Sequence, residues 1–127
     1  MQDNARYQVH VQVEPAYLEH ESDPDQEHYV FSYTVTIRNT GQVAVKLLNR
    51  HWLITDANGG ERTVDGEGVV GEQPYLEPGH QFRYTSGAML NTPVGSMEGS
   101  YDMLADDGTA FQAAIAPFTL AMPRKLH

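Results

Sequence analysis

The fold class is decided by one stretch of the chain, Tyr29-Val30-Phe31-Ser32-Tyr33-Thr34-Val35-Thr36-Ile37. Large apolar side chains stand at every second position, and smaller or polar ones alternate with them. A period of two is that of a β-strand, whose successive side chains point to opposite faces. Aromatic and β-branched residues are also enriched in strands. We therefore expect a strand here, the most strongly indicated one in the chain.

The same alternation recurs on both sides of this stretch. We expect further strands at residues 7–14, 43–55, 61–64, 81–86, 97–103 and 111–122. Turns are indicated at Asn39–Gly41, Asp56–Gly60, Pro78–Gly79 and Asp106–Gly108, and loops at 19–27 and 87–95. Leu47 and Leu48 break the alternation, which predicts a β-bulge. Pro117 predicts an edge position or a bulge.

No segment of about twelve residues has the period of an amphipathic helix. Seven to eight short strands separated by turn signals are typical of an all-β protein, and we expect an antiparallel β-sandwich. The chain contains no cysteine, so the sandwich has no disulfide and lacks the Cys…Trp…Cys pattern of an immunoglobulin domain proper. A fibronectin type III or immunoglobulin-like arrangement fits best, with a small barrel as the alternative.

Composition limits the number of domains and the classes of ligand. A chain of 127 residues fits a single domain, residues 1–127, with an expected ordered core at about 6–122 and a flexible C-terminal tail. The absence of cysteine excludes thiolate catalysis, iron–sulfur clusters and cysteine-ligated zinc. The formal net charge of −9 argues against nucleic acid as a ligand, because phosphate binding needs a basic face.

The first residues of the chain precede no apolar segment of the kind found in signal peptides. No run of about 18 apolar residues occurs, so membrane insertion is not expected. We therefore expect a cytoplasmic protein.

The segment Gly66-Glu67-Gly68-Val69-Val70-Gly71 has the G-x-G-x-x-G spacing of a phosphate-binding loop. Backbone N–H groups in such a turn can hold an anion without a helix. Two prolines and a glycine at 74–79 leave no room for the helix that follows this motif in dinucleotide-binding folds. The candidate anion loop is Gly66, Glu67, Gly68 and Gly71, and a structural turn that uses positive φ is the favoured alternative.

Arg50 and His51 form a second candidate site, a recognition patch that includes the neighbouring Trp52. The arginine could bind a carboxylate or phosphate, and the indole could stack on a base. Neighbouring residues of a strand point to opposite faces, so the three cooperate only if the strand is bulged. The alternative, which we favour for Trp52, places it in the core between the sheets with its indole N–H satisfied.

No catalytic or metal site is indicated. The six histidines show no i, i+4 pairing, and we expect no metal and no cofactor. Ser86 and Ser96 lack the G-x-S-x-G elbow of a hydrolase nucleophile. Asp106-Asp107-Gly108 is explained by a turn rather than by a calcium loop.

Several blocks of the sequence follow one another in a specific order. They are Arg50–Asp56, Val64–Gly71, Gln73-Pro74, Pro78-Gly79, Tyr84–Gly87 and Pro93–Tyr101. In this order the blocks resemble the ApaG family, also called CorD in some bacteria, and a weaker similarity extends from about Tyr7 to Leu120. The resemblance implies a fibronectin type III-like sandwich and a small bacterial protein.

The resemblance also implies a functional setting. Genes of this family tend to lie beside one for a diadenosine tetraphosphate hydrolase, and the family is associated with cobalt resistance and magnesium efflux. The same domain is appended to eukaryotic F-box proteins and to a DNA-polymerase-interacting protein, where it resembles a protein-interaction module. Family membership establishes no catalytic activity.

Two hypotheses of function follow. The first is a non-enzymatic binding module whose sheet edge or loop face contacts a protein partner. The second is a small-ligand sensor that binds a nucleotide polyphosphate, pyrophosphate or a divalent cation through Gly66–Gly71. An enzyme is disfavoured, because no nucleophile–base pair is indicated. Edge strands can also pair two copies of a chain, so a homodimer is left open.

Overall fold

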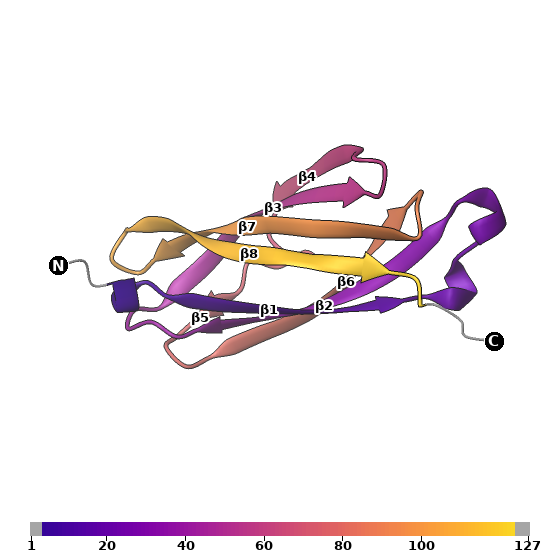
Figure 1. The fold of residues 1–127 in the computed structure, drawn as a ribbon. Helices are drawn as coiled ribbons and strands as arrows, with labels where there is room; N and C mark the ends of the chain where they lie inside the picture. The colour runs from indigo at the N-terminus through magenta and orange to yellow at the C-terminus, as the bar shows by residue number, and fades with distance from the viewer. Residues whose placement is uncertain (1–3, 124–127) are drawn as a thin grey trace.

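The computed structural model describes residues 4–123, whose strands form two antiparallel sheets (Figure 1). The three-stranded sheet has the order β1 (Val9–Tyr17), β2 (Tyr29–Asn39), β6 (Gln81–Leu90). The five-stranded sheet has the order β4 (Glu61–Glu67), β3 (Val45–Asp56), β7 (Val94–Ala105), β8 (Ala110–Ala121), and β5 (Tyr75–Leu76) pairs with β3. Short 3-10 turns lie at Asn4–Arg6, Glu19–Glu21 and Pro24–Gln26. The predicted all-β sandwich is confirmed.

The core lies between the two sheets and follows the period of two. On β2 the side chains of Phe31, Tyr33, Val35 and Ile37 are buried, while those between them are only half-buried. The facing sheet contributes buried residues from four of its strands, among them Val45, Leu47, Trp52, Ile54, Leu76, Met97, Tyr101, Met103, Ala113, Ile115 and Leu120. The stretch that indicates the strand in the sequence is thus the central strand of its sheet, between β1 and β6.

Both predicted irregularities are present. The register of β3 against β7 shifts between Leu47 and Asn49, which confirms the bulge at the double leucine. The register of β7 against β8 shifts between Met97 and Gly99, and Pro117 lies in the part of β8 opposite this shift. Because β8 is also an edge strand, Pro117 occupies an edge and a bulge at once, where its missing N–H leaves no ladder bond broken.

Several expected strand boundaries are wrong. The strand expected to end at residue 86 continues to Leu90, so that only Asn91–Pro93 connects it to β7, instead of a loop at 87–95. The return strand expected to end at residue 64 runs to Glu67 and includes Gly66. The strand expected at residues 7–14 lies at Val9–Tyr17. In the sequence, Gly66 and Gly87 indicate turns. In the structure, both lie within strands, because pairing with a neighbouring strand overrides the local preference of glycine.

The expected turns at Asp56–Gly60, Pro78–Gly79 and Asp106–Gly108 are present, each with a glycine at positive φ. The expected flexible tail lies largely outside the described residues. Among the residues that the structure describes, no helix has the length and apolar character needed to cross a membrane.

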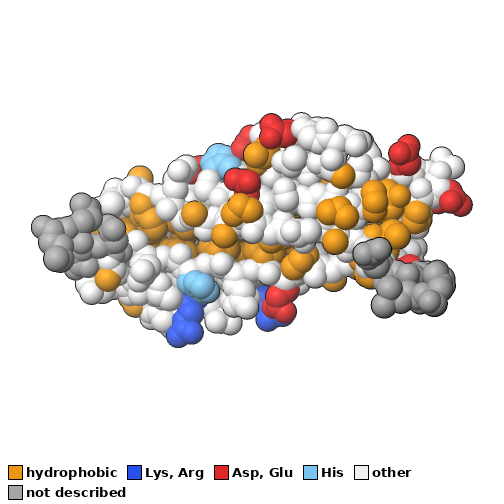
Figure 2. Space-filling model, viewed as in Figure 1, with side chains coloured by type: hydrophobic (Ala, Val, Ile, Leu, Met, Phe, Trp, Pro, Cys, Tyr) orange, Lys and Arg blue, Asp and Glu red, His pale blue; other side chains and the backbone are white. Residues whose placement is uncertain are grey.

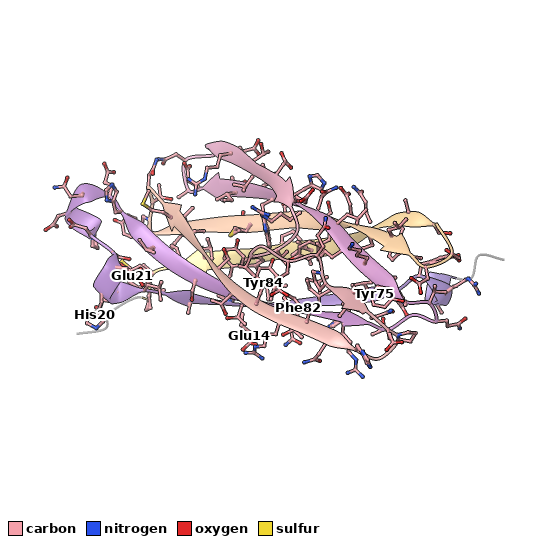
Figure 3. The ribbon with its side chains drawn as sticks, turned by 180° about the vertical axis from the view of Figure 1, so that it is seen from behind. Glu14, His20, Glu21, Tyr75, Phe82 and Tyr84 are labelled. Atoms are coloured by element: carbon pink, nitrogen blue, oxygen red, sulfur yellow. The ribbon has the colours of Figure 1, made fainter. Side chains whose placement is uncertain are left out.

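The sandwich is closed on one side and open on the other. Strands β1 and β8 lie side by side and bring the two sheets together there, with apolar side chains along the seam (Figures 1 and 2). On the opposite side the sheets end in β6 and β4, which do not pair with one another. Figure 3 shows this side, with Phe82 and Tyr84 labelled on β6. Both open edges therefore expose backbone groups that no strand of the described chain covers.

Candidate functional site

A cleft of about 230 Å³ lies between the open edges of the two sheets. Its lining includes Arg50, Trp52, Arg62, Val64, Ala88 and Met89. The first two belong to β3, the next two to β4, and the last two to β6. We refer to this hollow as the β4–β6 cleft.

Cross-strand register explains how the cleft forms. Trp52 lies opposite Val64, and Arg50 lies opposite Gly66, so all four face the same side of the five-stranded sheet. Trp52 faces the core, where it is only 3% exposed. Val64 lies one strand further out, beyond the cover of the three-stranded sheet, and stays 38% exposed. The inner face of β4 therefore presents Val64 and Arg62 beside the open edge of β6.

Trp52 is in the core, as predicted, but its indole N–H is not satisfied. The rings of Tyr33, Tyr101 and Phe118 pack edge-on around it, with centroid distances of 5.2, 6.5 and 5.9 Å. Among the described residues, Trp52 Nε1 has no hydrogen-bond partner. The expectation of a satisfied N–H is thus wrong, and an orphaned buried donor costs about 1–3 kcal/mol. Its buried faces leave no room for a base to stack.

Arg50 points to the inner face and holds the glycine segment. Its guanidinium lies so close to Gly66 that a Cβ at this position would be 2.7 Å from Cζ. Arg50 Nη1 donates to the carbonyls of Glu67 and Gly68, at 3.1 and 2.9 Å. A side chain at position 66 would therefore have to displace the flexible end of Arg50, a constraint that the sequence alone does not reveal.

The rest of the glycine segment is a turn whose amides bond largely within the protein. Gly68, with φ of 66°, donates to the carbonyl of Leu48 at 2.8 Å. Val69 and Glu72 exchange two backbone hydrogen bonds, at 2.8 and 2.9 Å. At the tip, Gly71 has φ of 83°, and the space around it is open. Anion binding by Gly66, Glu67, Gly68 and Gly71 stays a prediction.

The two residues of the predicted recognition patch point to opposite faces of β3. Arg50 faces the β4–β6 cleft, whereas His51 faces outward. The bulge that could have aligned them lies earlier, between Leu47 and Asn49. The structure therefore places Arg50 and His51 in two different environments.

His51 lies between two carboxylates on the outer face of the five-stranded sheet. Its Nδ1 is 2.7 Å from Asp65 Oδ1 on β4, and its Nε2 is 2.8 Å from Asp102 Oδ2 on β7. Asn49 and Gln112 also donate to Asp102, each at 3.1 Å. This group, the His51 cluster, joins four neighbouring strands. Sequence reasoning missed it, because only the register brings these positions together.

The hydrogen bonds of the His51 cluster shift two pKa values in opposite directions. Those to Asp102, and then to Asp65, raise the pKa of His51 because they favour the imidazolium. Hydrogen bonds from His51, Gln112 and Asn49 lower the pKa of Asp102 to about 2. The two nitrogens of the His51 ring point to separate carboxylates. The described residues contain no group of three acidic or histidine side chains able to hold a metal ion.

The chemistry available in the β4–β6 cleft is that of donors. Two arginines line it, and none of the cleft residues named above carries a carboxylate. A larger hollow of about 460 Å³ lies at one end of the sandwich, lined by Tyr17, Pro24 and Met122 among others, and it offers no comparable set of donors among the described residues. The β4–β6 cleft is therefore the candidate site.

Comparison with known proteins places the chain in a family. The model of the ApaG domain family matches residues 19–105. Protein ApaG of Xanthomonas euvesicatoria pv. vesicatoria (strain 85-10) and Protein ApaG of Xanthomonas axonopodis pv. citri (strain 306) are each 57% identical over 127 residues, the whole of both chains.

Solved structures agree with this match. The putative ApaA protein from Bordetella pertussis superposes with a TM-score of 0.91 at 49% identity, covering 94% of this chain and 97% of that chain. A structural-genomics target superposes with a TM-score of 0.88 at 50% identity, covering 98% of this chain and 92% of that chain. Since the family model matches most of the chain and these relatives match it from end to end, the chain belongs to the ApaG domain family.

Proposed function

We propose that this protein is a non-enzymatic module that binds a partner protein by pairing an extended segment of it with β6. The observation that supports this proposal is the open edge of β6, which pairs only with β2 over the described chain. At ten residues, β6 is long enough to support such a ladder. In this proposal the protein acts in the cytoplasm, and the family's association with cobalt resistance and magnesium efflux operates through the partner.

The hydrogen bonds at the ends of β6 indicate which backbone groups face the open edge. The carbonyl of His80, the residue before β6, accepts a hydrogen bond from the backbone N–H of Asn39 at the end of β2. The carbonyl of Met89 instead accepts from Arg62 on β4. Alternate residues of a strand direct their N–H and C=O groups to opposite sides. Thr85 and Gly87, which are in phase with Met89, therefore also direct theirs to the open edge.

Gly87 offers a matched test. Gly87→Pro removes one N–H from the open edge and none from the ladder with β2, whereas Gly87→Ala keeps it. A Cβ at Gly87 would meet only Phe31 O, at 3.5 Å, which is an ordinary contact. The wild-type chain and the two variants are each used to capture proteins from a bacterial extract. We expect Gly87→Ala to capture the same proteins as the wild-type chain and Gly87→Pro to lose them. Equal capture by all three would contradict edge pairing at β6.

A second copy of the chain is the alternative occupant of this edge. Sedimentation velocity of the purified protein distinguishes the two, because a homodimer through β6 would dissociate in Gly87→Pro and persist in Gly87→Ala. If the protein is monomeric at all concentrations, a second copy does not occupy the edge of β6, and the partner is another protein.

A small-ligand sensor is the second candidate function. The observation that favours it is the tip of the glycine segment, where Val70 and Gly71 both adopt positive φ and Gly71 borders open space. Consecutive residues of this kind can direct backbone N–H groups at an anion, and the nearby carboxylates of Glu67 and Glu72 could instead attract a cation. Amide NMR shifts during titration with pyrophosphate, diadenosine tetraphosphate, magnesium and cobalt test it. Saturable shifts centred on Gly66–Gly71 would support the sensor, and flat spectra at millimolar ligand would end it.

A further inference from the structure

Two arginines line the β4–β6 cleft, and none of the residues that line it carries a carboxylate. Trp52 Nε1 is buried without a partner among the described residues. Arg50 Nη1 donates hydrogen bonds to two backbone carbonyls, and Arg50 forms no ion pair with a described carboxylate. Arg62 donates to one carbonyl and likewise forms no described ion pair. Arg62 is exposed, so water can satisfy its remaining donors, whereas Trp52 Nε1 lacks the partner that buried donors normally have.

Two arginines share this cleft although the chain as a whole is acidic. The chain has 17 acidic residues against 8 lysines and arginines. Elsewhere on the described chain, Arg6 and Arg83 are near carboxylates, with N–O distances of 3.6 and 3.7 Å to Asp107 and Glu14. Arg38 and Lys46 likewise form no ion pair among the described residues, but both are exposed and lie outside the cleft. Arg50 and Arg62 share one cleft whose lining carries no carboxylate, so this cleft is complementary to a negative group supplied from outside.

Arg62 links this acceptor site to the open edge of β6. Its Nη2 donates to the carbonyl of Met89, at 2.6 Å, across the mouth of the β4–β6 cleft. A strand that paired with β6 would donate its own N–H to the Met89 carbonyl and so displace Arg62. The displaced guanidinium, still beside the cleft, would then be free to bind a carboxylate.

We propose that the β4–β6 cleft receives an acidic side chain, Asp or Glu, of an extended partner segment that pairs with β6. This inference rests on the proposed function and adds the chemistry that selects the partner. The carboxylate accepts hydrogen bonds from the guanidinium groups of Arg50 and Arg62. Alternate side chains of the added strand face the cleft, so the acid occupies one fixed position in the segment.

The test starts with random nonapeptides displayed on phage and selected on the full chain. We expect the selected peptides to share Asp or Glu at one position, flanked by β-branched residues. The best of them is then synthesised with blocked termini in an acidic form and in the matched form that has Gln or Asn instead. Binding is followed through Trp52, the single tryptophan of the chain, by its emission and its indole N–H resonance.

A double-mutant cycle measures the contact. Arg62→Gln should weaken the acidic peptide roughly tenfold or more, as expected for a charge-assisted hydrogen bond, and leave the amide peptide nearly unchanged. Arg62 is exposed, so this variant should fold. Arg38→Gln, on an exposed position of β2 outside the cleft, is the matched control and should bind both peptides as the wild-type chain does.

The outcomes separate this inference from the proposed function. If Arg62→Gln weakens both peptides equally, or if selected peptides share no acid, the acidic contact is wrong, while loss of binding in Gly87→Pro would still support edge pairing. If binding survives Gly87→Pro, or if no peptide is selected, both are overturned. Sodium acetate and inorganic phosphate are also titrated alone. If either shifts the indole N–H resonance of Trp52 to saturation with an affinity similar to that of the peptide, the cleft binds free anions, and the proposal of an acidic side chain from a partner segment is wrong.

Discussion

The hydroxyl groups of Tyr84 and Tyr101 bond to one another inside the sandwich, with 2.5 Å between their oxygens. Tyr84 belongs to β6 and Tyr101 to β7, so this hydrogen bond joins the two sheets. Burial raises the pKa of Tyr84 to about 12 and raises that of Tyr101 as well. Both hydroxyls therefore stay protonated throughout the physiological range, and each is the other's polar partner in the core.

The first prediction concerns this pair. Tyr84→Phe or Tyr101→Phe alone should lower the free energy of unfolding by about 1–3 kcal/mol, because each leaves a buried hydroxyl without its partner. The double variant removes both hydroxyls and should cost less than the sum of the single changes. Urea unfolding of the four proteins checks the cycle. Strict additivity would mean that the hydroxyls do not depend on one another.

The second prediction concerns Gly66 and Arg50. Gly66→Ala forces the guanidinium of Arg50 away and should cost about 1–3 kcal/mol of stability, as overpacking does. In an Arg50→Ala background the same change should cost clearly less, because the obstructing side chain is gone. Thermal unfolding of both pairs gives the comparison. An equal cost in the two backgrounds would show that the contact between Arg50 and Gly66 is not what requires the glycine.

The third prediction separates the glycines of the turn. Gly68 and Gly71 both have positive φ, but only Gly68 has a neighbour, the backbone carbonyl of Glu72, in the place of a Cβ. Gly71→Ala should therefore cost only the strain of positive φ, about 1–2 kcal/mol, and Gly68→Ala clearly more. Chemical denaturation of the two variants measures the difference. Equal costs would indicate that the turn can move away from Glu72.

The fourth prediction is a pH dependence from the His51 cluster. The raised pKa of His51 means that its contribution to stability is complete below about 6.5 and is lost as the pH rises through the folded value. The lowered pKa of Asp102 means that its contribution is present above about 3.8 and is lost as the pH falls toward about 2. The cluster therefore stabilises most between these limits, by a modest amount because His51 is 39% exposed.

Urea midpoints measured from pH 5 to pH 9 check this dependence. The wild-type chain should lose stability above pH 6.5 relative to His51→Gln, whose profile should be flatter. His10→Gln is the control, since His10 is exposed on β1 and has no ion pair within the described part of the chain. Parallel profiles for wild type and His51→Gln would show that the two carboxylates do not hold the imidazolium.

The sequence predicts the candidate site only in part. The period of two on β3 places Trp52 inward and separates Arg50 from His51, and the structure agrees on both points. The partners of these residues lie on other strands, at positions such as Arg62, Asp65, Met89 and Asp102. Which positions of two strands meet depends on the register, and here bulges shift that register between Leu47 and Asn49 and between Met97 and Gly99. No local pattern contains that information.

The sequence predicts the all-β class, the central strand, most of the turns and most residues of the core, because alternation and turn chemistry are properties of neighbours along the chain. The packing of the two sheets closes the sandwich along β1 and β8 and leaves it open between β4 and β6, and no local pattern predicts this. It also left Trp52 Nε1 without a partner and set Arg62 across the cleft to Met89. The physical reason is that a cleft and its unpaired donors arise from how two sheets overlap, which is settled by contacts between residues far apart in the sequence.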